Sequence, residues 1–558
     1  MRSRKTKDGL TVLAVAGTNV VLLGFNLPKA KTTTLMGFGV QRTDHASGET
    51  VWMRGFKRFP STDPGTAPGE SLSTREHPIQ SFQWADYTVN PGASYSYRVV
   101  ALHGAPETLK EVRSVTVDVD TEAEGNTDGA LTHHVFFNRG AAASQAYQAR
   151  FGERSPDEVG DPAFAWLSRG LYEAFDAFLA RAKSNKWKLR AALYECHYEE
   201  PMRLFKRAKT AGADVRIVYD ARKQTPTPKE KVPLGKKNAA TIKKLGLTRV
   251  SIARKANPSY IAHNKFIVLL EGDTPRAVWT GSMNLSKNGI YGQANVGHVV
   301  EDPKVAKAFF EYWQRLATDP EGEDLRPENE DASSIDSGPI KKGTTVLFSP
   351  RSGNAQLERI ATLISEAQHA AFLTLPFGIV STVAPSLTQD DGVLRCILLD
   401  SRGNTDGHKT ALKNARALPN VIAAVGNRIQ SSALDAWVQE AANPWSTNVE
   451  YVHTKFLLID PLSNDPIVVT GSANFSDPSV ESNDENTLVI RGDKRVADIY
   501  LTEFKRLFDH HAFREMLANN HGRVPDPSPL KEEPADWLSR HFDNGGPGEL
   551  RRRYFSGS

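Results

Sequence analysis

Residues 263–284, HNKFIVLLEGDTPRAVWTGSMN, decide the fold because residues 453–474, HTKFLLIDPLSNDPIVVTGSAN, repeat their pattern. His, Lys, Gly, Ser and Asn recur in the same order, and each residue of the second copy lies 190 positions after its counterpart in the first. Chance explains such an agreement of residue types and spacings poorly. An internal duplication explains it well.

Each copy predicts two strands that carry polar side chains at their ends. His263 and Lys265 lie two positions apart at the start of an apolar, β-branched run, and His453 and Lys455 do the same. Residues two apart on a strand share a face, so imidazole and ammonium should point the same way. The Gly-Ser-x-Asn follows a second apolar run, where glycine allows a ligand to approach the backbone closely.

The recurring side chains form a set that suits an anionic phosphodiester. Histidine transfers protons or acts as a nucleophile near neutral pH, and lysine places a compact positive charge beside an anion. Hydroxyl and amide groups donate hydrogen bonds to oxygens. We expect one of His263 and His453 to attack phosphorus while the other protonates the leaving group. The phosphate would be bound by Lys265, Lys455, Ser282, Ser472, Asn284 and Asn474.

The composition is that of a globular protein, with 39% hydrophobic and 24% charged residues and a net charge of +4. Cys196 and Cys396 lie in apolar runs, which predicts buried free thiols. Neither motif copy has metal-ligand spacing, so no metal or cofactor is predicted. No run reaches the length of a membrane span. The apolar start is better explained by two strands than by a signal peptide, which favours a cytoplasmic location over secretion.

Changes of pattern along the chain predict its organisation. Residues 8–120 hold many short β-like runs and indicate a small antiparallel sandwich. Residues 131–320 and 340–520 alternate strands and helices in the same order, which predicts two α/β lobes. The acidic segment 319–339 is predicted to be a linker, and the Pro-, Gly- and charge-rich segment 523–558 a flexible tail.

Both halves resemble the phospholipase D superfamily, whose signature is His-x-Lys-x4-Asp followed by Gly-Ser-x-Asn. The second copy fits fully, with Asp460 as the signature aspartate and GSANFS after it. Over residues 131–520 the resemblance implies a pseudo-two-fold, bilobal fold with one active site between the lobes, so that a monomer suffices. It also implies metal-independent catalysis through a phosphohistidine, which water or an alcohol resolves. Residues 84–102, WADYTVNPGASYSYRVVAL, resemble the later strands of a fibronectin type III domain.

The first copy departs from the signature. Leu270 stands where the signature has Asp, and Ala294 in QAN is the expected counterpart of Glu485 in NDEN. The resemblance makes Glu485 the carboxylate that supports a catalytic imidazole. Reasoning from the residues pairs it with His453, whereas the habit of the family gives the nucleophile role to the N-terminal histidine, and both assignments stay open. Asp460 either supports the site directly or holds nearby backbone.

Three functions fit these features. A phosphodiesterase acting on phospholipid is slightly favoured, because a site made from two fused halves is typical of that branch. A nuclease acting on DNA or RNA is favoured by the basic stretch 203–255, which would attract a polyanion. Leu270 and Ala294 motivate a non-catalytic phosphate-binding protein. Trp437 and Trp445, just before the second motif, are candidates for peripheral contact with an anionic surface.

Overall fold

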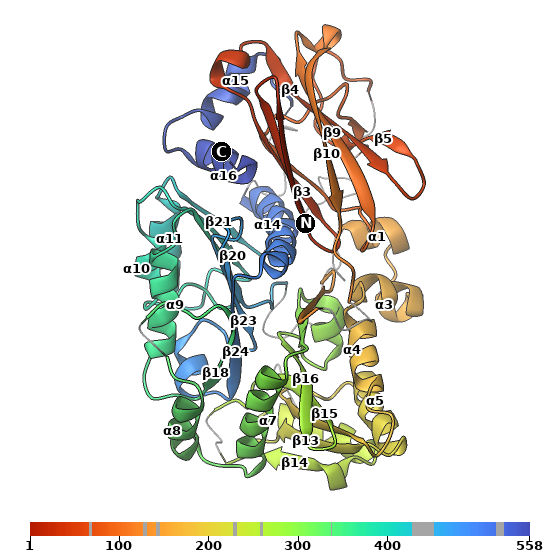
Figure 1. Ribbon diagram of the computed structural model, residues 1–558, viewed down its shortest axis with the longest axis vertical. Coiled ribbons are helices and arrows are strands. Elements are labelled where there is room, and N and C mark those ends of the chain that lie inside the picture. The colour runs from red at the N-terminus through yellow and green to blue at the C-terminus, as the bar shows by residue number, and fades with distance from the viewer. Residues whose placement is uncertain are drawn as a thin grey trace.

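The computed structural model describes residues 1–65, 70–125, 131–140, 145–226, 232–256, 260–335, 338–426, 451–519 and 529–557. Within these residues the chain forms an N-terminal β-sandwich and two α/β lobes that lie side by side beneath it (Figure 1). The predicted fold class, a bilobal α/β protein preceded by a small all-β domain, is confirmed. Trp437 and Trp445 lie outside the described residues.

Two four-stranded antiparallel sheets form the sandwich, and β9 shows why its strands form. The first residues of β9, SYSYRV, alternate between partly exposed and buried, the period-two pattern of a strand with one face on a core. The likeness to fibronectin type III stays a prediction. In spatial order the sheets are β1 (Arg2–Lys7), β2 (Leu10–Ala16), β3 (Val21–Asn26), β8 (Gln83–Asp86), and β10 (Lys110–Asp120), β9 (Ser94–His103), β4 (Leu35–Asp44), β5 (Thr50–Trp52); β6 (Arg54–Gly55) pairs with β7 (Leu72–Ser73).

Each lobe is built on a mixed seven-stranded sheet, and the two sheets have the same topology. In both sheets, the last three strands in the spatial order given below are parallel to one another, and the other neighbouring strands pair antiparallel. In spatial order lobe 1 has β11 (His133–Phe137), β17 (Val296–Val300), β16 (Thr274–Gly281), β15 (Lys265–Glu271), β12 (Trp187–Leu193), β13 (Asp214–Asp220) and β14 (Ser251–Arg254). Lobe 2 has β18 (Gly343–Ser349), β24 (Glu485–Arg491), β23 (Ile467–Gly471), β22 (Phe456–Ile459), β19 (Ala370–Leu375), β20 (Leu394–Leu399) and β21 (Val421–Val425).

Helices cover both faces of each sheet, so the central strands are apolar along their whole length. The outer faces pack against lobe-specific helices, whereas α7 and the long α14 lie between the sheets in one core shared by both lobes (Figure 1). Lobe 1 has α1 (Gln145–Phe151), α2 (Pro156–Val159), α3 (Asp161–Ser168), α4 (Leu171–Ala180), α5 (Glu199–Thr210), α6 (Leu234–Lys244) and α7 (Pro303–Ala317). Lobe 2 has α9 (Ala355–Ser365), α10 (Ala384–Leu387), α11 (Asp406–Arg416), α13 (Asp477–Glu481) and α14 (Lys494–Asn519).

Two segments predicted to lack structure are folded. The acidic linker 319–339 contains α8 (Gly322–Ala332), whose Leu325 is fully buried in the shared core. The described part of the tail 523–558 forms α15 (Pro534–Leu538) and α16 (Pro547–Ser556). Trp537 is only 2% exposed and packs in the sandwich core, so this segment is an integral part of the fold. No helix among the described ranges is long and apolar enough to cross a membrane.

Candidate active site

The two motif copies occupy equivalent places at the same edge of the two sheets. His263 and His453 come just before β15 and β22, and each motif glycine is the last residue of the following strand. Gly281 and Gly471 have φ of 128° and 151°. A Cβ on either would lie 2.3 Å from a backbone carbonyl of the neighbouring strand, so only glycine fits at these two positions.

The lobes meet at these motifs through a symmetric pair of backbone hydrogen bonds. The N–H of Ala294 donates to the carbonyl of Tyr451 at 2.7 Å, and the N–H of Asp484 donates to the carbonyl of Ile261 at 3.0 Å. Residues 484 and 451 lie 190 positions after 294 and 261, so one bond is the pseudo-two-fold image of the other. The duplicated motifs therefore face each other across the lobe interface.

Glu485 contacts the histidine of the opposite lobe. Its Oε1 lies 2.7 Å from Nδ1 of His263, and both side chains are buried. The predicted pairing of Glu485 with His453 is therefore wrong. Because the carboxylate begins β24 in lobe 2 while the ring precedes β15 in lobe 1, sequence proximity within one half misidentified the partner.

An asparagine takes the corresponding place beside the second imidazole. Nδ1 of His453 lies 2.9 Å from Oδ1 of Asn295 and 3.1 Å from the carbonyl oxygen of Ser282. A carbonyl can only accept, so Nδ1 carries the proton and the neutral ring keeps its lone pair on Nε2. Asn295, 190 residues before Glu485, is the true counterpart of that residue, and the assignment of Ala294 was one position off. The motif spacing itself could have located Asn295.

The motif serines hold these two partner side chains. Ser472 Oγ donates to Glu485 Oε2 at 2.6 Å, and Ser282 Oγ donates to Asn295 Oδ1 at 2.8 Å. Both serines are fully buried. Their hydroxyl protons are thus committed within the protein, which contradicts the expected direct contact of Ser282 and Ser472 with phosphate.

The two lysines lie beside the imidazoles and share their burial. Lys265 Nζ donates to the carbonyl of His263 at 2.6 Å, and Lys455 Nζ to that of His453 at 2.5 Å. Burial lowers the pKa of Lys265 to about 8. Burial and then the charge of Lys265 lower the pKa of Lys455. An anion beside both ammoniums would favour their charged forms.

The imidazoles and the carboxylate also titrate abnormally. Burial, followed by Lys265 and Lys455, lowers the pKa of His263 well below its usual range, and burial with the same lysines does so for His453. Burial raises the pKa of Glu485 to about 8 against the opposing pull of Lys265. Such opposed shifts in neighbouring groups are typical of acid–base sites.

The motif asparagines are buried without a partner for one polar atom. Asn284 and Asn474 are 5% and 9% exposed, and Oδ1 of each makes no hydrogen bond to any described residue. Buried polar atoms are normally paired. Two unpaired atoms related by the pseudo-two-fold therefore indicate a place for a ligand.

Asp460 is an anchor of backbone. Its carboxylate accepts the N–H groups of Gln368, His369 and Ala370 at 2.7–2.8 Å. This is the structural alternative left open by the sequence, and these contacts do not support the catalytic role predicted for Asp460. Leu270, its counterpart in lobe 1, is buried in the core, so an apolar contact replaces the anchor there.

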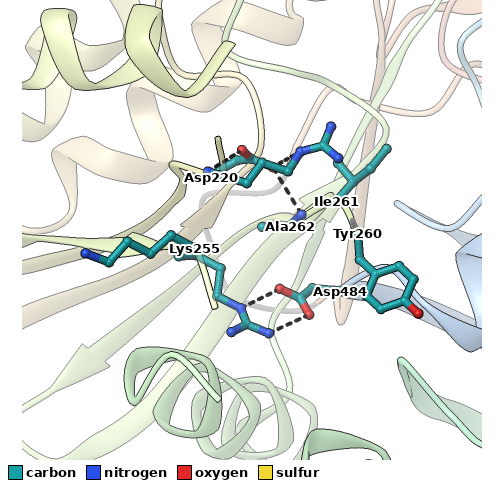
Figure 2. A pocket seen from close by; sticks show the side chains of 8 residues that line it. Asp220, Lys255, Tyr260, Ile261, Ala262 and Asp484 are labelled. Carbon is teal, nitrogen blue, oxygen red and sulfur yellow. Dashed lines mark hydrogen bonds and ion pairs between the residues drawn. The ribbon is translucent and has the colours of Figure 1, made fainter. Parts of the chain in front are cut away.

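Two buried aspartates that sequence reasoning missed support the segments that precede the histidines. Asp220, the last residue of β13, accepts the N–H of Ala262 at 3.2 Å, and Asp400, just after β20, accepts the N–H groups of Tyr451 and Val452 at 2.7 and 2.8 Å. Figure 2 shows Asp220 among the residues of a small pocket that is also lined by Ala262, the residue before His263. Burial raises the pKa of Asp220 to about 6. In the sequence, a polar residue at the end of an apolar strand could have revealed these two aspartates.

Several basic residues of the stretch 203–255 are paired with acidic side chains. Arg203 and Lys244 both pair with Glu199 on the outer helices. Arg254 is buried and bonds Asp484 of lobe 2 at 2.9 Å. Many of these charges are therefore neutralised within the protein, and attraction of a polyanion by this stretch stays a prediction.

A family model described as cardiolipin synthase, PLD-like domain, matches residues 178–317 and 388–508. One matched segment falls in each lobe. Each lobe thus contains a segment similar to this PLD-like domain, whose family members are phosphodiester-processing enzymes.

Several solved structures are similar to the chain, whereas no curated protein sequence matches it. Polyphosphate kinase from Porphyromonas gingivalis is 11% identical with a TM-score of 0.37, and the similarity covers 64% of this chain and 47% of that one, about half its length. Phosphatidylserine synthase from Haemophilus influenzae Rd KW20 is 13% identical with a TM-score of 0.42 and coverages of 62% and 85%. NUC from Salmonella typhimurium, a phospholipase D family member, is 19% identical with a TM-score of 0.23 and coverages of 30% and 96%.

Proposed function

We propose that this protein is a metal-independent phosphodiesterase that works through a phosphohistidine intermediate and acts on a phospholipid. The observation that carries the proposal is the pair of Glu485 and His263 across the lobe interface. It joins the two motif copies into one site with two lysines, as a phosphodiester site requires.

The unequal partners of the imidazoles support unequal roles. A carboxylate on Nδ1 stabilises the positive charge that a ring acquires when Nε2 attacks phosphorus, so His263 is the nucleophile. His453 has only neutral oxygens on Nδ1, which makes its protonated form the stronger acid. In the first step the phosphorus–nitrogen bond forms, the bond to the leaving oxygen breaks, and His453 gives that oxygen its proton. Water or an alcohol then attacks phosphorus, releases His263 and returns a proton to His453.

The phosphate would lie between Lys265 and Lys455, within reach of Asn284 and Asn474. Its negative charge would offset the burial that lowers the pKa of both lysines and the repulsion from Lys265 that further lowers the pKa of Lys455. Each asparagine amide, turned by half a rotation, would offer Nδ2 to a phosphate oxygen in place of the unpartnered Oδ1. Two ammoniums and two amides supply the donors that a phosphodiester transition state needs.

The assignment of roles is tested with two diesters in the presence of EDTA. On bis(p-nitrophenyl) phosphate, whose leaving group departs without a proton, His453→Ala should keep much more of the burst of first-step product than His263→Ala. On a diester with an alkyl leaving group both variants should be inactive. Loss of the burst only in His453→Ala would reverse the roles, and an effect of EDTA would contradict the metal-independent mechanism.

The substrate is tested with labelled phosphatidyl lipids beside single- and double-stranded DNA and RNA. Turnover of lipid that His263→Ala abolishes supports the proposal. Cleavage of nucleic acid with steep salt dependence would make the protein a nuclease. Failure to turn over any of these or the activated diester would leave a phosphate-binding protein without catalysis.

A further inference from the structure

Glu195 lies between the two halves of the first motif. It follows β12 two residues after Leu193, whose partner on the neighbouring strand is Lys265. Its carbonyl accepts the N–H of Leu285 at 3.0 Å, next to the Gly-Ser-x-Asn turn. The N–H of Tyr194 donates to the carbonyl of Asn264 at 2.9 Å. The backbone that carries Glu195 is therefore fixed on both sides by motif residues.

Its neighbour Tyr194 also belongs to the site. The Tyr194 ring meets the His263 ring edge to face at 4.8 Å, and Lys265 Nζ lies 5.3 Å from the centre of the same ring. Glu195 comes next and is partly exposed. Its carboxylate makes no hydrogen bond or ion pair with any residue that the structure describes.

The carboxylate acts on both lobes. Burial dominates the lowered pKa of Lys265 and of Lys455, and Glu195 is among the charges that oppose this lowering for each lysine. A single carboxylate that influences both ammoniums lies near the junction of the lobes, where the phosphate would sit.

The equivalent position of lobe 2 carries no charge. Leu193 pairs with Tyr219 in lobe 1, and Leu375 pairs with Leu399 in lobe 2. Tyr219 and Leu399 directly precede the supporting aspartates Asp220 and Asp400, so Leu375 is the counterpart of Leu193. Two residues further on, Phe377 corresponds to Glu195, and it is 40% exposed. The two lobes therefore differ in charge at this position. A residue with a purely structural role would not require that difference.

We propose that Glu195 is a charge-selectivity residue of the proposed phosphodiesterase, which admits phosphodiesters with one negative charge and disfavours dianionic phosphomonoesters. The proposal rests on the proposed function. In the proposed first step His263 and Glu485 hold one proton between them and carry one negative charge, while protonated His453 carries one positive charge, so the two lysines and Glu195 leave the site with one net positive charge. That charge matches a monoanionic diester, whereas a dianion meets an uncompensated repulsion. Hydrolysis turns a diester into a monoester, so the same repulsion would speed product release.

The test compares binding of methyl phosphate and dimethyl phosphate to the full-length protein at pH 7, by competition or by 31P NMR titration. At this pH methyl phosphate is mostly dianionic, because its second pKa is about 6. In Glu195→Gln the ratio of the monoester Kd to the diester Kd should fall by on the order of tenfold. The matched control Glu199→Gln removes a carboxylate of the outer face and should leave the ratio unchanged.

An unchanged or increased ratio in Glu195→Gln would overturn the proposal. If Glu195 only kept the lysines charged, its loss would weaken binding of the dianionic monoester more than binding of the monoanionic diester. The ratio of the monoester Kd to the diester Kd would then rise. Binding requires no turnover, so an inactive protein that shows the expected ratio would refute the proposed catalysis but not the selectivity. Binding of neither ester would refute both.

Discussion

At the scale of single residues, the main finding is that the two imidazoles differ in what faces Nδ1. His263 has a carboxylate and His453 an amide and a carbonyl, although both histidines belong to the same repeated motif. A carboxylate that stabilises an imidazolium can raise the reaction rate by several orders of magnitude, whereas an amide mainly fixes the tautomer. In the proposed mechanism, residues 295 and 485 therefore determine the chemistry of the two steps as much as the histidines do.

Replacing Glu485 with Gln should cost about 10³–10⁴ in kcat, as the loss of a catalytic carboxylate does in serine proteases. Gln keeps the size of the side chain and can still accept a hydrogen bond from Ser472. The expected result is a folded but nearly inactive enzyme, measured by steady-state kinetics beside circular dichroism. A small loss, of the size seen for a remote surface variant, would contradict the orienting role.

The same substitution should change how stability depends on pH. Burial raises the pKa of Glu485 from 4.5 to about 8, so the folded state holds this proton more tightly than the unfolded state does. Its contribution to stability is fully present below pH 4.5 and is lost as pH rises through 8. Melting temperatures measured from pH 4.5 to 8 should therefore fall less steeply for Glu485→Gln than for the wild type. Parallel curves would show that Glu485 does not titrate in this range.

Replacing Asn295 with Asp should move the alkaline limb of the rate profile to higher pH. An aspartate 2.9 Å from Nδ1 would raise the pKa of His453 by about 1–3 units. Since His453 must be protonated to act as the acid, activity would persist to higher pH. A profile of kcat against pH checks this, and a shift of the acidic limb alone would identify His453 as the base or nucleophile.

The sequence predicted that the two motif copies meet between the lobes but not how their side chains pair. Spacing located both histidines, both lysines and the motif asparagines, because those types recur at a fixed interval. It could not show that Glu485 reaches across to the other lobe, since a periodic pattern carries no information about which lobe a side chain faces. The serines were misread because a hydroxyl can bind a ligand or a neighbouring side chain equally well.

At the scale of elements, the structure shows how the motif strands are held in place. Asp460 follows β22 with φ of 46° and gathers three backbone N–H groups at the start of β19. The aspartates at the ends of the parallel strands do the same for the segments before the histidines. Sequence reasoning predicted the strands from their apolar runs, but it missed α8, α15 and α16, whose few apolar residues are spaced too widely to reveal a buried face.

Replacing Asp460 with Asn should lower stability without lowering kcat. Asn tolerates the left-handed backbone at this position but cannot accept three hydrogen bonds with a full charge. The expected loss is about 1.5–3 kcal/mol in the free energy of unfolding. Denaturant titration together with kcat measured well below the melting temperature tests this. A large fall in kcat with unchanged stability would return Asp460 to the catalytic residues.

At the scale of the whole molecule, the C-terminal segment joins the sandwich to lobe 2. Trp537 packs in the sandwich core and donates from Nε1 to the carbonyl of Leu35, while Phe555 contacts Phe372 of lobe 2. The N-terminal strand is tied to the same lobe by the ion pair of Arg2 with Asp498 at 2.8 Å. The sandwich is thus fastened to the catalytic lobes at both ends of the described chain (Figure 1).

Truncating Trp537 to Ala should destabilise the sandwich by about 3–5 kcal/mol, the usual effect of removing a buried tryptophan. The site lies between the lobes, so kcat per folded molecule should not change. Trp537→Phe, which keeps much of the packing, should lose less. Limited proteolysis and denaturant titration measure both effects. Equal stability of Trp537→Ala and the wild type would show that the segment does not hold the sandwich.

The asymmetry at residues 295 and 485 depends on the gene having been duplicated and joined. In an assembly of two identical subunits, every substitution appears twice, so both rings would acquire the same neighbour. A single polypeptide removes that constraint, and each half becomes free to specialise. One half could then keep the acidic residue that sustains attack while the other lost it and became the proton donor, a division of labour that an ancestor with one copy could not have evolved.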